Sequence, residues 1–285
     1  MTNNNVSVVI ATLGEVSLEG TIESLNNSSI VPKEILICIP VEYAKNVKRY
    51  SYSNIKVVKT TVRGQVAQRV VGFKKATCPY VLQLDDDIIL DLYCIEKLLE
   101  TVVSSKSVAA GPKLYDHITK KYHSFLIPSD IKLVWFNTFF YFIANGRGGY
   151  QPGKISKSGI NFGIPDMPNL FYDIDWLCGG CLMHRKENLI LTNYFPFSGK
   201  AYAEDLFHSK LLRSNNVTLV RSGEAKCYVD STSSKGGGWL NIIRNYSKPI
   251  IPMKFLVKSI NGSIARMYLI NWLMHIRLLL IKIYK

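Results

Sequence analysis

The sequence lacks the features that define several large classes of protein. Its 285 residues contain no internal repeat and no low-complexity tract, which excludes solenoid and fibrous proteins. No basic leader followed by a long apolar core opens the chain, so we expect no secretory signal peptide. The apolar stretch 131–145 is shorter than the roughly 20 residues of a membrane-spanning helix. The sequence therefore predicts a cytoplasmic globular protein.

The pattern of cysteines and the shortage of acidic residues also bear on the kinds of site that the chain can hold. The six cysteines form no framework of a small secreted domain, and only Cys178 and Cys181 make a C-x-x-C pair. Because no second such pair follows, a zinc or redox site is disfavoured. Acidic residues number 21 against 35 basic ones, and the net charge of +14 points to nucleic acid, an anionic membrane or phosphorylated small molecules. The basic residues are spread along the chain, so charge alone does not choose among these partners.

What the sequence does contain is an alternation of apolar runs with segments of helical spacing. The runs predict strands at 6–13, 34–41, 54–60, 80–84 and 107–115, and the spacing predicts helices at 14–27, 65–76 and 91–105. This order predicts an α/β fold with a mainly parallel sheet flanked by helices. Less regular features follow, namely a loop at 145–170, a strand within 173–187, a loop and helix at 197–215 and two short strands at 217–230.

Three consecutive carboxylates, Asp85, Asp86 and Asp87, end the strand 80–84. Like charges repel and lose hydration when they are buried, so a divalent cation is an economical reason to gather them. Mg²⁺ and Mn²⁺ often take only one or two protein carboxylates, with phosphates and water as the other ligands. Strand alternation lets Asp85 and Asp87 point to one side and Asp86 to the other. The alternative is an acidic cap for the helix that follows, which accounts for one aspartate.

The order of the motifs resembles family 2 glycosyltransferases of the GT-A fold. The likeness runs from residue 6 to about residue 230. It comprises the first strand S-V-V-I-A-T, the helix start GQVAQR, the D-x-D at a strand end, a G-G-x-x-x-x-R segment and a later E-D pair. The resemblance implies a Rossmann-like sheet and transfer of a sugar from a nucleotide diphosphate sugar with inversion at the anomeric carbon. It also implies Mn²⁺ or Mg²⁺ as the cofactor.

The resemblance implies roles for individual residues as well. The residues implied in binding the nucleotide sugar are Thr12, Glu42, Gln65, Arg69, Asp85 and Asp86, and those implied in binding the metal are Asp87 and Asp85. Gly179 and Gly180 are implied to make the close backbone turn that faces donor and acceptor. The position of Tyr202 just before the E-D pair suits stacking on a sugar ring of these substrates, and packing within the domain is the alternative. Asp205 is implied as the general base that takes the proton of the acceptor hydroxyl, with Glu204 beside it. The alternative is that the pair has no catalytic role and only stabilises the start of a helix.

The chain departs from the family pattern at two places. Pro40 stands where many relatives carry an aspartate that reads the base, so Glu42 is a weak substitute. Asp230 stands where many GT-A enzymes have a late histidine as third metal ligand. The contacts to the base and the third metal ligand are therefore not defined by the resemblance.

The C-terminal part is expected to differ from the rest. We expect a catalytic domain at 1–230, with a nucleotide-sugar half at about 1–115 and an acceptor half at about 116–230, and a flexible loop and helices at 231–285. Residues 265–285 mix apolar, aromatic and basic side chains, as a helix lying on an anionic membrane does. A helix docked on the domain or in an oligomer interface fits the same pattern.

These observations predict a membrane-peripheral, metal-dependent glycosyltransferase of surface polysaccharide biosynthesis. The donor would be a UDP or dTDP sugar, and the acceptor a hydroxyl of a glycan or of a lipid-linked molecule. A sugar-phosphate nucleotidyltransferase is the alternative enzyme, but its Gly-rich phosphate loop is not evident after the first strand. A nucleic-acid-binding protein would need basic and aromatic residues clustered on one element, which the scattered lysines and arginines do not provide.

Overall fold

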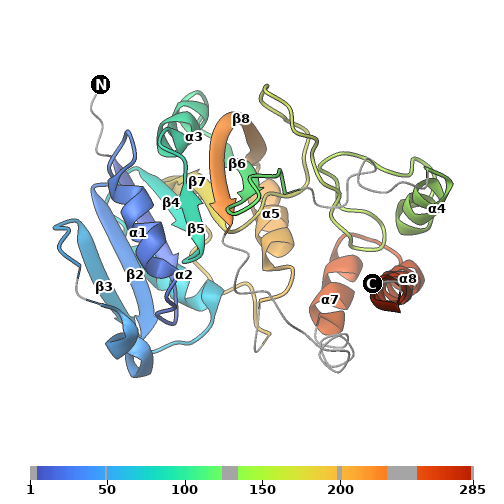
Figure 1. Ribbon diagram of the computed structural model, residues 1–285, viewed down its shortest axis with the longest axis horizontal. Helices are drawn as coiled ribbons and strands as arrows, with labels where there is room; N and C mark the ends of the chain where they lie inside the picture. Colours follow the sequence, from blue (N-terminus) through green and yellow to red (C-terminus); the bar gives the residue numbers. More distant parts are fainter. Residues whose placement is uncertain (1–4, 49, 124–133, 198–200, 230–248, 284–285) are drawn as a thin grey trace. The chain divides into compact units, whose positions relative to one another are not determined.

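The computed structural model of the chain describes residues 5–48, 50–123, 134–197, 201–229 and 249–283, which form two compact units (Figure 1). The first unit comprises residues 1–123 and 166–234, and the second comprises residues 124–165 and 235–285. These units are not the two halves expected on either side of residue 115. That functional division and the boundary at 230 stay predictions.

The first unit is built on one eight-stranded sheet with the order β3-β2-β1-β4-β7-β6-β8-β5. Its strands are β1 (Val6–Ala11), β2 (Glu34–Pro40), β3 (Ile55–Thr60), β4 (Tyr80–Leu84), β5 (Ile88–Leu90), β6 (Val108–Asp116), β7 (Cys181–Arg185) and β8 (Thr218–Val229). The first four strands in space, β3 to β4, are all parallel, whereas β7 is antiparallel to both of its neighbours. The predicted α/β fold with a mainly parallel sheet is therefore confirmed.

Helices cover the sheet because its central strands are apolar on both faces. Every residue of β1 and β2 is buried, as expected for parallel strands between two helical layers. On one face Val9 and Cys38 pack against α2 (Gln65–Lys75), where Gly72 has no side chain and lets the helix approach. The other helices of this unit are α1 (Leu18–Asn26), which contacts β5, α3 (Cys94–Val103), which contacts β6, β7 and β8, and α5 (Glu204–Ser214), which contacts β8.

The prediction of two short strands at 217–230 was wrong, because the structure has the single strand β8. Its pairing with β6 shifts register between Gly111 and Lys113, so an irregularity is absorbed without breaking the strand. Gly223 lies at the bend in the sequence S-G-E, where a Cβ atom would come within 1.8 Å of the Pro168 carbonyl oxygen. The glycine that suggested a turn instead permits a close backbone approach.

The second unit is helical. It contains α4 (Val134–Asn145), α7 (Ile250–Ser259) and α8 (Ile264–Ile283), and α8 contacts both of the other helices. The core of this unit gathers Phe140, Tyr141, Ile143, Ala144, Phe162 and Ile270, with Leu273 and Met274 packed against it. Within the described part of the chain, no helix is both long enough and apolar enough to cross a membrane.

Candidate active site

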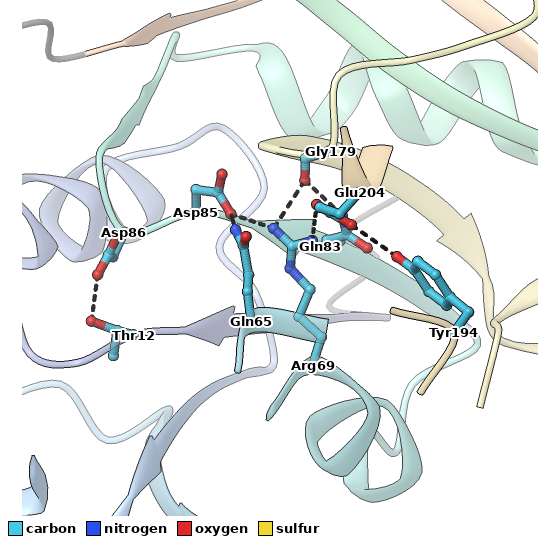
Figure 2. Close-up of polar contacts among 9 residues, drawn as sticks. All are labelled: Thr12, Gln65, Arg69, Gln83, Asp85, Asp86, Gly179, Tyr194 and Glu204. Atoms are coloured by element: carbon cyan, nitrogen blue, oxygen red, sulfur yellow. Dashed lines mark hydrogen bonds and ion pairs between the residues drawn. The ribbon is translucent and has the colours of Figure 1, made fainter. Parts of the chain in front are cut away.

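Polar side chains of the first unit meet where β1 and β4 end and where α2 and α5 begin. The carboxyl ends of parallel strands lie at one edge of a sheet, and a helix N-terminus offers free backbone N–H groups there. Figure 2 shows nine residues of this site and their contacts. Seven of the nine are predicted from the sequence, and Gln83 and Tyr194 are the two additional residues.

Arg69 is the centre of this network. Its guanidinium is 1% exposed and binds two carboxylates: Nη2 donates to Asp85 Oδ1, and Nη1 donates to Glu204 Oε1 at 2.6 Å (Figure 2). Burial alone lowers the pKa of Arg69, but the charges of Glu204 and Asp85 raise it above its usual value. A buried guanidinium needs such partners, because an unpaired buried charge costs several kcal/mol. Arg69 thus joins the end of β4 to the start of α5.

The three aspartates after β4 have different surroundings, and all three are half-buried. Asp85 Oδ1 also accepts a hydrogen bond from Gln65 Nε2 at 2.9 Å. Asp86 Oδ2 accepts a hydrogen bond from Thr12 Oγ1 at the end of β1, and burial raises the pKa of Asp86 above its usual value. Asp87 directly precedes β5. The alternation expected from the sequence stays a prediction, because β4 ends at Leu84 and Asp86 and Asp87 lie in the turn before β5.

Gly180 lies beside the carboxylate oxygen of Asp85 that does not bind Arg69. A Cβ atom on Gly180 would come within 3.2 Å of Asp85 Oδ2, so the glycine keeps that oxygen accessible. The Asp85 backbone N–H donates to the Gly180 carbonyl at 2.8 Å, which fixes this approach. In the parts of the chain that the structure describes, no three His, Cys, Asp or Glu side chains are grouped to hold a metal ion. The donor set therefore fits a hard cation held by one or two carboxylates and completed by ligand oxygens.

Glu204 and Asp205 begin α5 but differ in their contacts. Glu204 is buried, and it accepts bonds from Arg69 and from the Tyr194 hydroxyl, the latter at 2.9 Å to Oε2. Asp205 is half-buried, and its Oδ1 accepts the backbone N–H of Leu206 at 3.0 Å. Burial and the neighbouring charge of Glu204 raise the pKa of Asp205 to about 7. Glu204 is therefore fixed in place, whereas Asp205 has the proton affinity of a base that works near neutral pH.

The backbone before this pair is strained. Ala203, which precedes the helix, has φ of 59° in the left-handed region, where a Cβ atom costs roughly 1–2 kcal/mol. Gly179 lies opposite, where a Cβ atom would come within 2.7 Å of Glu204 Oε1 and 3.3 Å of the Asp205 Cβ. The backbone of the C-G-G-C segment thus packs against the side chains of the E-D pair. A side chain at residue 179 would displace the glutamate.

Two residues of this site were missed in the sequence analysis. Gln83 is fully buried in β4, and its Nε2 donates to the Gly179 carbonyl at 2.6 Å. A polar residue in the otherwise apolar strand YVLQL was a signal that could have identified it. Tyr194 lies in a loop before α5, and burial raises its pKa well above the usual value, so it stays a hydroxyl donor. No spacing in the sequence marks Tyr194.

The structure does not bring all of the predicted residues into this network. Glu42 is exposed in the 3-10 turn Val41–Asn46 after β2 and is not part of the hydrogen-bonded network among the described residues. Tyr202 is half-buried two residues before Glu204. Asp230 and the loop 231–248 lie outside the described residues. The roles of these residues stay predictions.

Comparisons with known proteins agree with the fold and the motifs. A comparison with curated protein sequences finds no match. Among solved structures, GalNAc-T7 with UDP, GalNAc and Mn²⁺ is similar with a TM-score of 0.56 and 14% identity, over 79% of this chain and 43% of that one. The mannosyltransferase PcManGT from Pyrobaculum calidifontis, in complex with GDP-Man and Mn²⁺, is similar with a TM-score of 0.54 and 14% identity, over 91% of this chain and 65% of that one.

At such identities the likeness concerns the fold alone, and this chain spans less than two thirds of either protein. The fold is of the GT-A type that the sequence predicted. The model of glycosyl transferase family 2 matches residues 7–155, which is just over half of the chain and includes β1, GQVAQR and the three aspartates. The chain therefore belongs to glycosyl transferase family 2.

Proposed function

We propose that this protein is an inverting glycosyltransferase. It transfers a sugar from a nucleotide diphosphate sugar, with UDP or dTDP as the nucleotide, to a hydroxyl of a glycan or lipid-linked acceptor in surface polysaccharide biosynthesis. The observation that carries the proposal is Asp205, a half-buried carboxylate with a pKa raised to about 7 at the same edge of the sheet as the three aspartates. Membership of family 2 favours glycosyl transfer over nucleotidyl transfer or nucleic-acid binding.

In the proposed reaction, Asp205 takes the proton from the acceptor hydroxyl as its oxygen attacks the anomeric carbon of the donor. The bond from that carbon to the diphosphate breaks, and inversion follows because attack and departure occur on opposite faces. Glu204 is a positioning residue here, since its two oxygens are taken by Arg69 and Tyr194. Its charge raises the pKa of Asp205, which makes the aspartate a stronger base.

The donor is proposed to lie along the ends of β1 and β4. Thr12 and Asp86 would line the nucleoside side, and Glu42 would contribute from the turn after β2. Asp85, held by Arg69 and Gln65, would face the sugar, and Gly179, Gly180 and Tyr202 would face both substrates. Asp87 and Asp85 would hold Mn²⁺ or Mg²⁺, which both solved relatives contain as Mn²⁺. When bound, such a cation neutralises the charge that develops on the leaving diphosphate.

Calorimetric titration tests the donor site directly. UDP, dTDP and GDP are each titrated with Mn²⁺ and with EDTA into the wild type and into Asp87→Ala. We expect one nucleotide to bind in a metal-dependent way and Asp87→Ala to abolish that binding. Asp91→Ala is a matched control, because Asp91 is a carboxylate on the same segment beyond β5. Folded protein that binds none of the three nucleotides would overturn the proposal.

The location of the enzyme is part of the same proposal. We place the protein in the cytoplasm, peripheral to the inner face of the membrane, with helix 265–285 toward anionic lipid. The basic and aromatic residues of this segment support that placement. This location at the membrane is also compatible with an oligomeric protein.

A further inference from the structure

The net charge of the chain is concentrated in one of its two units. Residues 124–165 and 235–285, the second unit, contain 13 lysines and arginines and a single acidic residue, Asp130. The first unit has 22 basic and 20 acidic residues. Twelve of the 14 net positive charges therefore belong to the helical unit. The basic residues are spread over both units, as the sequence indicates, and the net charge is uneven because the second unit has almost no acidic residues.

Helix α7 exposes a face that combines apolar and basic side chains. Ile251, Lys254, Phe255 and Lys258 follow the spacing i, i+3, i+4, i+7, which places them on one side of the helix. All four are exposed, and Ile251 is 67% exposed. The opposite side carries Leu256 and Val257, which are fully buried. Two large apolar side chains, Ile251 and Phe255, are thus exposed on the same face as two lysines.

Helix α8 exposes a second apolar face, with the spacing i, i+1, i+4. Tyr268, Leu269 and Trp272 are exposed, Trp272 by 55%, whereas Met267 and Ile270 are buried. The inner side of α8 packs into the core of its own unit, so the helix is docked on protein and still presents an outer side. Docking on protein thus holds for the inner side of the described part of α8, and membrane contact stays a prediction for its exposed side.

Helix α4 adds aromatic residues beside α8. Phe139 and Phe142 are about half exposed, while Phe140 and Tyr141 contribute to the core. Arg266 of α8 donates through Nη1 to the carbonyls of Phe142 at 3.0 Å and Ile143 at 2.7 Å. This bond satisfies carbonyl groups at the C-terminus of α4 and fixes the two helices to each other. The three helices thus belong to one packed unit (Figure 1).

We propose that α4, α7 and α8 form a docking unit for an anionic phospholipid bilayer, in which α7 and α8 insert apolar side chains and Lys254 and Lys258 contact lipid phosphates. A nucleic acid would match the charge but would not use exposed Ile251 and Leu269. A second copy of the chain would match the apolar faces but would bring two units of charge +12 together. A bilayer with anionic headgroups satisfies both properties. The proposal extends the membrane contact beyond residues 265–285 and does not depend on the catalytic assignment.

Vesicle sedimentation with the full chain tests the docking unit. We expect binding to vesicles of phosphatidylcholine and phosphatidylglycerol in equal amounts, little binding to phosphatidylcholine alone, and weaker binding as salt is raised. Lys254→Gln with Lys258→Gln should weaken binding by about fivefold for each lysine, or roughly 25-fold together. Leu269→Ala with Trp272→Ala should weaken it by about tenfold or more.

Two further variants separate membrane contact from general effects. Lys74→Gln with Lys75→Gln removes the same charge from exposed positions on α2 in the nearly neutral unit, and should leave binding almost unchanged. Trp272→Phe keeps an aromatic ring, so binding should persist while tryptophan quenching by brominated phospholipid falls. Thermal unfolding followed by circular dichroism checks that each variant is folded.

Several outcomes would overturn the proposal. These are absence of vesicle binding by folded protein, equal binding to neutral vesicles, or equal losses from the α2 and α7 lysine pairs. Binding to an oligonucleotide without binding to vesicles would assign the basic unit to nucleic acid instead. A dimer that dissociates in the Leu269→Ala, Trp272→Ala variant, without vesicle binding, would assign the apolar faces to self-association. None of these readouts requires activity, so they are independent of the proposed reaction.

Discussion

Two carboxylate clusters of the first unit, one at the start of β2 and one at the start of α5, have opposite properties. At the start of β2, Glu34 accepts hydrogen bonds from the Ser7 hydroxyl, the Thr77 N–H and the Thr77 hydroxyl, each at 2.7 Å, and pairs with Lys56 at 2.8 Å. Burial acts to raise the pKa of Glu34, but these partners lower it to about 2. Around α5, burial and a like charge raise the pKa of Asp205 to about 7. The first cluster stabilises its anion, whereas the second keeps a carboxylate that readily takes up a proton.

The difference separates a structural carboxylate from a catalytic candidate in physical terms. Both are acidic side chains that accept hydrogen bonds within the fold. What differs is whether the surrounding groups favour the charged form. The following predictions use this contrast, beginning with the largest expected effect.

Removing the charge of Asp205 should abolish most activity without unfolding the protein. Asp205→Asn loses the base, so we expect the transfer rate to fall by about 10²–10⁴-fold. In the wild type the rate should rise with pH through about 7, because the deprotonated form is the active one. The measurement is nucleotide release against pH. A variant that retains the wild-type rate and pH profile would exclude Asp205 as the base.

The same substitution should leave stability unchanged or improve it. The folded pKa of Asp205, about 7, lies above the ordinary value of 3.8, so the folded state binds the proton more tightly. The Asp205 contribution to the free energy of unfolding therefore falls as pH rises from about 4 to 7. At pH 8, Asp205→Asn should gain roughly 1–2 kcal/mol in urea denaturation. A loss of stability would mean that the surroundings favour the charged form of Asp205 over the protonated form.

Glu34 should respond in the opposite way. Its folded pKa of about 2 lies below the ordinary value of 4.5, so its stabilisation is fully present above 4.5 and is lost as pH falls through about 2. Glu34→Gln should cost about 2–3 kcal/mol near neutral pH, since Lys56, Ser7 and Thr77 lose an anionic acceptor. Nucleotide binding should not change. Urea denaturation at pH 7 and calorimetry measure the two effects, and a change in nucleotide affinity would contradict the assignment.

Tyr194 should have a smaller effect, directed at the site. Tyr194→Phe removes the hydrogen bond to Glu204 Oε2 and leaves a buried carboxylate oxygen with one donor fewer, which costs about 1–2 kcal/mol. Because Glu204 is then held less firmly, the transfer rate should fall while the affinity for the nucleotide stays. Tyr172→Phe is the matched control, since Tyr172 is exposed. If the two variants have the same stability and the same transfer rate, Tyr194 has no role in the site.

Ala203 should give the smallest effect. Glycine adopts φ of 59° without the clash of a Cβ atom, so Ala203→Gly should stabilise the folded backbone while it loosens the unfolded chain. The net gain should be less than about 1 kcal/mol. Thermal unfolding measures it. A clear loss would show that the left-handed backbone at this position carries no strain.

The sequence predicted the regular part of the fold because local signals are strong there. Apolar runs with β-branched residues marked β1, β2 and β4, and the spacing of GQVAQR marked the start of α2. It did not predict that β7 pairs antiparallel with β4, because that pairing joins residues about one hundred positions apart and leaves no local pattern. The sequence also does not distinguish the S-G-E segment within β8 from a turn between two strands.

The candidate site was predicted as a set of motifs and not as a network. Asp85, Arg69 and Glu204 were all identified, but the guanidinium that binds both carboxylates depends on the distance between α2 and α5. That contact and the Tyr194 hydrogen bond hold both oxygens of Glu204 and distinguish it from Asp205. Two adjacent acidic residues in a sequence do not show which one is the base, and the burial and partners that set them apart are properties of the fold.

The place of β7 between β4 and β6 also constrains how the chain acquires its structure during synthesis. β1 to β4 can pair as soon as they leave the ribosome, but the free edge of β4 must wait until Cys181 to Arg185 have been translated. Such distant pairing slows folding and leaves an unpaired edge that can aggregate. Arg69 would meanwhile await Glu204, its partner 135 residues later. Slower translation before residue 181 should therefore lower the yield of native protein more than slower translation after residue 229.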